Sequence, residues 1–173
     1  MIIIGIDPGP KTCGVVVYDT EARHVIEAHK AMPVADAIES ICGVHSWAVD
    51  HVAIERVKAG RFAGDDYLLT AEVVGRCQQA AIVARLPYTL HYRSEVLRYL
   101  DLLGSRGNRD ALVRAELIAM HGGTKQIACG TKKAPGPLFG VSSHAWQALG
   151  LAYACWLILE SKAAKAAAGA GSR

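Results

Sequence analysis

The feature that most constrains the fold lies at the start of the chain, where a short apolar run, residues 2–6, ends in Asp7 and a turn rich in glycine and proline follows. A continuous apolar run of this length is typical of a strand buried on both faces of a sheet. The apolar pattern resumes at residues 15–17, so the two segments predict a hairpin with Asp7 at a strand tip. A carboxylate in that position needs a cation or hydrogen-bond donors. Asp7 is therefore either a metal- or phosphate-site residue or an ordinary turn aspartate, because Asp before Pro-Gly is common in turns.

Length and composition predict one compact domain. The chain has 173 residues, of which 51% are hydrophobic, enough to bury most of the apolar surface around one core. It has no run near the ~20 apolar residues of a membrane span, and the first strand is too short for a signal peptide. We expect a soluble, cytoplasmic protein with no membrane partner. The odd number of cysteines and the absence of a CxxC pair favour reduced thiols over a zinc knuckle or a disulfide framework.

Charge changes sign along the chain, although the net charge is only +3. Residues 1–55 hold three basic and eight acidic residues, whereas residues 104–133 hold six basic and two acidic ones. An acidic cluster facing a basic rim fits a metal-dependent nuclease, since acids hold cations and Lys or Arg hold phosphates. A solvated surface of mixed charge gives the same pattern, and charge alone favours that second interpretation.

Periodicity in the first half predicts four strands and two helices. The strands are 2–7, 13–19 and 23–30, joined as a meander, and 49–55, which ends in Glu55. The helices are 34–43 and 65–85, and Asp65 or Asp66 is expected to cap the second one.

The second half predicts a fifth strand at 86–92 and three further helices. The helices are 94–103, 110–120 and a long buried one that starts at Ser142 or Ser143 and ends near residue 160. In the middle helix we expect four residues to face the core: Leu112, Ala115, Ile118 and Ala119. Residues 122–141 are expected to form a loop rich in Gly, Pro and Lys, and the low-complexity tail, 161–173, is expected to be disordered.

This order of elements is that of the RNase H-like fold, and the chain resembles the RuvC family of Holliday-junction resolvases, phage-type members included. Four segments in order carry the resemblance: IGIDPGPKTCGVVVYD, VAIERV, YRSEVLRYLDLLGSRGNRDALV and SSHAWQALGLAYA. It implies an α/β fold, a single RNase H-like domain over residues 1–160 with a five-stranded mixed sheet flanked by helices. It also implies a crossover junction endodeoxyribonuclease of DNA recombination and repair, which nicks four-way junctions symmetrically as a homodimer.

Phosphodiester hydrolysis with two metal ions, Mg²⁺ or alternatively Mn²⁺, calls for carboxylates brought together from separate elements. The resemblance implies that the strands ending in Asp7 and Glu55 are neighbours, with Asp7 as the bridging ligand and Glu55 on one ion. Glu55 could instead be a strand-end glutamate paired with Arg56 or Lys58.

The last helix supplies the remaining catalytic positions in this family, usually as two acids three residues apart. Here those positions are His144 and Gln147, and the spacing places both on one helical face. His144 is suited to metal binding, although a first-turn histidine held by Ser142 or by the preceding loop is the alternative.

Gln147 departs from the family pattern because its amide carries no charge, so metal affinity should fall. Three outcomes remain open. The site could be active with weaker or manganese-favouring binding, it could be completed by another acid such as Asp110 or Asp65, or the protein could bind junctions without cutting them.

DNA contacts are expected from basic residues around these motifs. Arg106, Arg109 and Arg114 flank the GSRGN turn, and Arg109 matches the family best as a phosphate contact. Three residues follow Glu55 in a loop that reaches the junction centre in the family: Lys58, Arg61 and Phe62. Phe62 could wedge between unstacked bases or pack on the core. Lysines in the later loop could bind phosphates or form a solvated charge run: Lys125, Lys132 and Lys133.

Two further expectations concern assembly and a competing function. The helix 65–85 is the expected dimer interface, with Leu68, Leu69 and Val73 as contacts that could equally be core. The segment DPGPKTCG also resembles the first phosphate loop of actin and sugar kinases. Chain length counts against that nucleotide-binding alternative, because the kinase fold needs two such domains.

Overall fold

Five strands form one mixed sheet in the computed structural model, which describes residues 1–43, 48–58 and 64–170. The sheet order is β3-β2-β1-β4-β5. The antiparallel meander β1, β2 and β3 is followed by β4, parallel to β1, and by β5, parallel to β4. The strand bounds are β1 Ile2–Asp7, β2 Thr12–Asp19, β3 His24–Pro33, β4 His51–Arg56 and β5 Tyr88–Tyr92. The predicted five-stranded mixed sheet is confirmed, and β1 lies at its centre.

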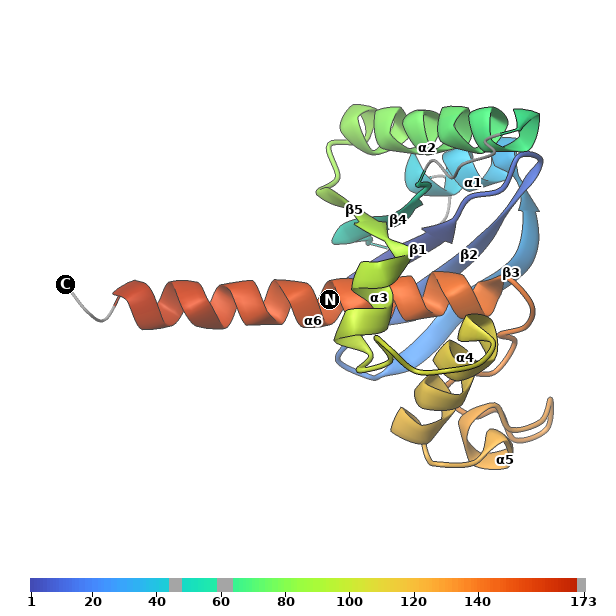
Figure 1. Ribbon diagram of the computed structural model, residues 1–173. Coiled ribbons are helices and arrows are strands. Elements are labelled where there is room, and N and C mark those ends of the chain that lie inside the picture. The colour runs from blue at the N-terminus through green and yellow to red at the C-terminus, as the bar shows by residue number, and fades with distance from the viewer. Residues whose placement is uncertain (44–47, 59–63, 171–173) are drawn as a thin grey trace.

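The central strands are buried on both faces, so alternate residues enter two separate cores. Ile4 and Ile6 pack with the helices of one face, α1 (Val34–Ile41) and α2 (Asp65–Val83). Ile3 and Tyr18 pack on the other face, against α3 (Arg93–Tyr99), α4 (Arg109–Met120) and α6 (Ala145–Ala170). Figure 1 shows this arrangement, with α1 and α2 above the sheet and α3, α4 and α6 below it.

Two glycines allow α6 to lie directly against the sheet. A Cβ atom at Gly5 in β1 would lie 2.1 Å from the carbonyl oxygen of Ala148, and one at Gly14 in β2 would lie 2.6 Å from that of His144. Both distances are far below van der Waals contact, so a larger residue would force the helix away. The first turn of α6 is therefore fixed beside the β1–β2 turn that follows Asp7.

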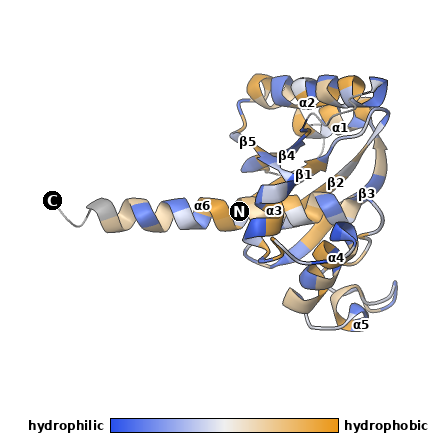
Figure 2. Cartoon of the chain, viewed as in Figure 1, coloured by the Kyte–Doolittle hydropathy of each residue, from blue (hydrophilic) through white to orange (hydrophobic). Residues whose placement is uncertain are grey.

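The tail differs from its prediction. Helix α6 continues to Ala170, and its second half projects beyond the sheet, where hydrophilic bands recur along it (Figures 1 and 2). The prediction of disorder from residue 161 is thus wrong for 161–170, while 171–173 lie outside the described residues. The physical reason is composition: Ala and Lys are strong helix formers, so an alanine-rich segment extends a helix that is already nucleated.

Two local predictions on the helices are also wrong. Gly64 rather than Asp65 or Asp66 is the N-cap of α2, and both aspartates lie in the first turn instead. The second is wrong in part: the buried residues of α4 are Val113 and Leu117, and Val113 packs beneath Gly150 of α6. Of the expected set, Ile118 packs against the core and Leu112 is half-buried, whereas Ala115 and Ala119 are exposed.

The structure adds detail to two further predictions, the loop 122–141 and the dimer face on α2. Within the segment, α5 (Lys125–Ala128) forms a short helix and Gly130 pairs with Pro135 in an isolated bridge. On α2, Val73 belongs to the core, whereas Leu68 and Leu69 are exposed. Across the described ranges, no helix is both long and apolar enough to cross a membrane.

Candidate active site

Asp7 and Glu55 lie side by side at the ends of the two central parallel strands. Ile6 of β1 pairs with Ile54 of β4, so the next residue of each strand reaches the same edge of the sheet. The side chains are only 19% and 16% exposed, respectively. The expectation that these strands are neighbours is therefore confirmed, and it places two partly buried carboxylates at one sheet edge.

His144 reaches the same point from the start of α6. Its Nδ1 atom lies 3.4 Å from Oδ2 of Asp7, and 69% of its side chain is exposed. The preceding residue, Ser143, has a φ angle of 46°, a left-handed conformation that few residues other than glycine adopt. This sharp turn delivers the chain from the loop into α6 with His144 facing Asp7.

Arg93 joins the cluster, and sequence reasoning missed it. It is the first residue of α3, directly after β5, and its Nη1 donates a hydrogen bond to Oε2 of Glu55 at 3.2 Å. Its Nη2 donates to Oδ1 of Asp110 in the first turn of α4. The one available signal was its place after a parallel strand, because the tips of β1, β4 and β5 share one edge.

These contacts identify the partner of Glu55. Its ion-pair partner is Arg93, not Arg56 or Lys58. The guanidinium of Arg56 instead lies over the ring of Tyr92, 5.1 Å from its centroid. Of the two acids considered for completing the site, Asp110 reaches it through Arg93, whereas Asp65 begins α2 on the opposite face of the sheet.

Burial dominates the electrostatics of the two carboxylates. It raises the pKa of Glu55 to about 7, against the opposing effect of Arg93, and the nearby charges of Asp7 and Asp110 add to the rise. Burial also raises the pKa of Asp7, although Arg93 and His144 act in the other direction. The site is thus short of positive charge, which is the condition under which buried carboxylates bind a divalent cation.

The acidic side chains of this edge do not form a ready-made metal site. Among the residues that the structure describes, no three Asp, Glu, His or Cys side chains form a group that could hold a metal ion. The guanidinium of Arg93 lies between Glu55 and Asp110 and pairs with both carboxylates.

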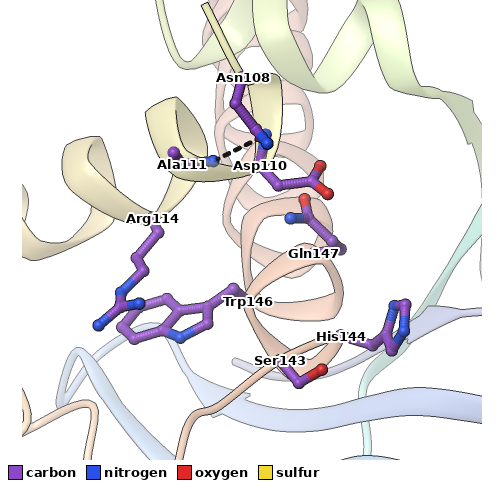
Figure 3. A pocket seen from close by; sticks show the side chains of 8 residues that line it. All are labelled: Asn108, Asp110, Ala111, Arg114, Ser143, His144, Trp146 and Gln147. Atoms are coloured by element: carbon purple, nitrogen blue, oxygen red, sulfur yellow. Dashed lines mark hydrogen bonds between the residues drawn. The ribbon is translucent and has the colours of Figure 1, made fainter.

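Gln147 is buried with its carbonyl oxygen unpaired. The residue is 6% exposed, and Oε1 has no hydrogen-bond partner within the described part of the chain. In Figure 3 its amide points toward the carboxylate of Asp110. Both line a cavity of about 310 Å³ together with six other residues: Asn108, Ala111, Arg114, Ser143, His144 and Trp146. A buried carbonyl oxygen without a partner is a ready ligand for water or a hard cation.

The predicted DNA-binding residues fall at different distances from this cavity. Arg114 lines it, and its guanidinium lies over the indole of Trp146, 5.4 Å from the ring centroid (Figure 3). Arg106 and Arg109 are exposed just before and at the start of α4.

The remaining candidates lie elsewhere. Lys132 and Lys133 are exposed in the turn between Gly130 and Pro135, and Lys58 lines a separate cavity of about 520 Å³. The other two, Arg61 and Phe62, lie outside the described residues.

No family model matches the sequence, and no curated protein matches it either. Two solved structures are similar over 89% of this chain and 92% of their own. The structure of Thermus thermophilus RuvC has a TM-score of 0.59 at 23% identity, and T. thermophilus RuvC in complex with a Holliday junction substrate has a TM-score of 0.58 at 22% identity. At this level of identity the likeness establishes architecture. The chain has the RNase H-like fold of RuvC.

Proposed function

We propose that the protein is a divalent-metal-dependent endonuclease that resolves four-way DNA junctions by nicking. One observation carries the proposal: two partly buried carboxylates, Asp7 and Glu55, lie at adjacent strand tips with His144 beside them. The RuvC fold supports it, since a similar structure was solved with a Holliday junction substrate.

The donor set fits Mg²⁺ or Mn²⁺. Asp7 and Glu55 offer the hard oxygen ligands that these ions prefer, and His144 adds a nitrogen suited to manganese. Burial raises the pKa of both acids, so a divalent cation would recover the free energy that their ionisation costs. When bound, the metal supplies positive charge to the phosphate and lowers the pKa of a bound water.

The protein groups then have separate tasks. Asp7, from the central strand, would hold the metal together with Glu55, and Glu55 would also orient the attacking water. Arg109 and Arg114 approach from α4 and hold the DNA backbone through charge-assisted hydrogen bonds to phosphate oxygens. Lys58, Lys132 and Lys133 extend this basic surface.

Resolution of a four-way junction needs two symmetric nicks, so we propose that the protein acts as a two-fold dimer in the cytoplasm. Leu68 and Leu69 are exposed on α2, 63% and 45% respectively, and are available for the interface. Large exposed apolar side chains of this kind are common at interfaces.

The test is nicking of a synthetic four-way junction with Mg²⁺ or Mn²⁺, with linear duplex of the same sequence as control. We expect symmetric nicks in the junction, leaving 5′-phosphate and 3′-hydroxyl ends, and little cleavage of the duplex. Failure to cut in either metal, with a retained gel shift, would reject the nuclease.

That outcome would leave the second candidate, a junction-binding protein that does not cut. The uncharged Gln147 favours it, because the helix that normally supplies two acids supplies none here. The nucleotide-binding alternative lacks comparable support, since the described residues form one five-stranded sheet rather than two such domains.

A further inference from the structure

The site contains a positively charged side chain, the guanidinium of Arg93. Arg93 binds Glu55 of β4 with one guanidinium nitrogen and Asp110 of α4 with another. The two acids come from different elements, so the guanidinium bridges them by one oxygen each, as a metal ion bridges carboxylates.

Arg93 is held in that position from both sides. Its backbone starts α3, where the amide of the preceding Tyr92 donates to Oε2 of Glu95 at 2.7 Å in a capping interaction. Its side chain is 23% exposed. A guanidinium stays charged at any working pH and presents its donors in a rigid fork, so it keeps two carboxylates apart at fixed geometry.

The charge around this guanidinium suits one divalent ion better than two. Asp7, Glu55 and Asp110 supply three negative charges when ionised, and Arg93 supplies one positive charge, which leaves a formal charge of −2. His144 and Gln147 add no negative charge, although the family usually has two acids at these positions. A second divalent ion would leave excess positive charge beside the partly buried carboxylates of Asp7 and Glu55, where that excess is costly.

We propose that the guanidinium of Arg93 takes the place of one of the two metal ions of two-metal hydrolysis, an inference that rests on the proposed function. The site would then bind a single divalent cation, beside Asp7 and His144. Asp110 is the counter-charge that keeps Arg93 in place. The buried Oε1 of Gln147, which faces the same cavity as Asp110 and has no partner in the described part of the chain, remains on the α6 side as a neutral ligand.

The test counts bound ions directly on the full chain, without DNA. Mn²⁺ titration followed by electron paramagnetic resonance and by calorimetry should give one ion per wild-type chain. Arg93→Gln, which keeps the approximate size and removes the charge, should bind a second ion, and Arg93→Lys should return the count to one.

A matched control separates the effect of the Arg93 contacts from the effect of the overall charge of α3. Arg98 lies on the same helix and is exposed, so Arg98→Gln removes one positive charge from α3 and should leave the count at one. Asp110→Asn removes one negative charge from the site and leaves Arg93 paired with Glu55, so the count should also stay at one.

The outcomes are distinct. Two ions bound to wild type together with junction cleavage would overturn this inference and leave the proposed function standing. One ion in both wild type and a folded Arg93→Gln would also overturn it. No bound ion and no nicking would reject the proposed function as well.

Discussion

The imidazole of His144 lies 3.4 Å from the carboxylate of Asp7, although the two residues come from the last helix and the first strand. This pairing depends on the close approach of α6 to the sheet, which the glycines at positions 5 and 14 permit. The geometry of the site therefore depends on the packing of the core, and single substitutions can test both.

Asp7→Asn should abolish junction nicking and preserve junction binding. The amide keeps the size of the side chain but removes the charge that a metal ligand needs. Nicking assays, gel shifts and circular dichroism on the same preparation measure the three properties. Loss of binding together with loss of fold would show that Asp7 is a structural turn residue.

Gly14→Ala should destabilise the protein by about 1–3 kcal/mol, because its Cβ would meet the carbonyl oxygen of His144 and the helix must shift. In a chain of this size that corresponds to roughly 2–4 °C in Tm per kcal/mol. Nicking should fall as well, since His144 moves with the helix.

Gly75→Ala is the control for that substitution. Gly75 lies within α2, and a Cβ there would have no atom within 4 Å. The change should stabilise the protein by about 0.5–1 kcal/mol through helix propensity. A folded, fully active Gly14→Ala with unchanged Tm would show that the close approach of α6 is not needed.

Glu55→Gln should stabilise the metal-free protein at high pH. Burial raises the pKa of Glu55 from 4.5 to about 7 in the folded state, so between these values the folded protein binds the extra proton. The stability of wild type therefore falls as pH rises through this window, by up to about 3 kcal/mol from this group alone.

The corresponding measurement is urea unfolding in a chelator at pH 4.5 and pH 8. The advantage of Glu55→Gln should be near zero at the lower pH and largest at the higher one. An equal difference at both values would show that the ionisation of Glu55 is not coupled to folding.

Gln147→Asp should tighten metal binding and weaken the metal-free protein. The new carboxylate would be buried in the cavity that Asp110 also lines, so without metal the two acids repel each other. With metal the added charge should lower the Mg²⁺ concentration for half-maximal nicking by about tenfold. Magnesium titrations of nicking and of Tm provide the check, and an unchanged midpoint would contradict a site limited by charge.

Much of the fold could be predicted from the sequence because its strands are short apolar runs with sharp boundaries. Asp7 and Glu55 were found for the same reason, since each ends such a run. The inward face of α4 was harder, because the contact of Val113 beneath Gly150 depends on tertiary packing rather than on periodicity. The helical tail was missed because its low complexity indicated disorder, whereas the high helix propensity of its alanines extends α6 to Ala170.

Arg93 could not be found in this way. Its partners Glu55 and Asp110 lie 38 and 17 positions away, and an isolated arginine after a strand has no periodic signature. Its role follows only from the alignment of three strand tips and the first turn of α4 at one edge. Long-range ion pairs of this kind are set by topology, and a single sequence does not record them.

The positions of Asp7, Glu55 and His144 along the chain also determine when the site can exist during synthesis. The first two residues are made early, but the β1–β2 turn meets its helix only after residue 144 and the first turns of α6 have left the ribosome. In a nascent chain whose sheet has already formed, His144 would still be missing from the site. The proposed catalysis is therefore withheld until the start of α6 has packed against the sheet.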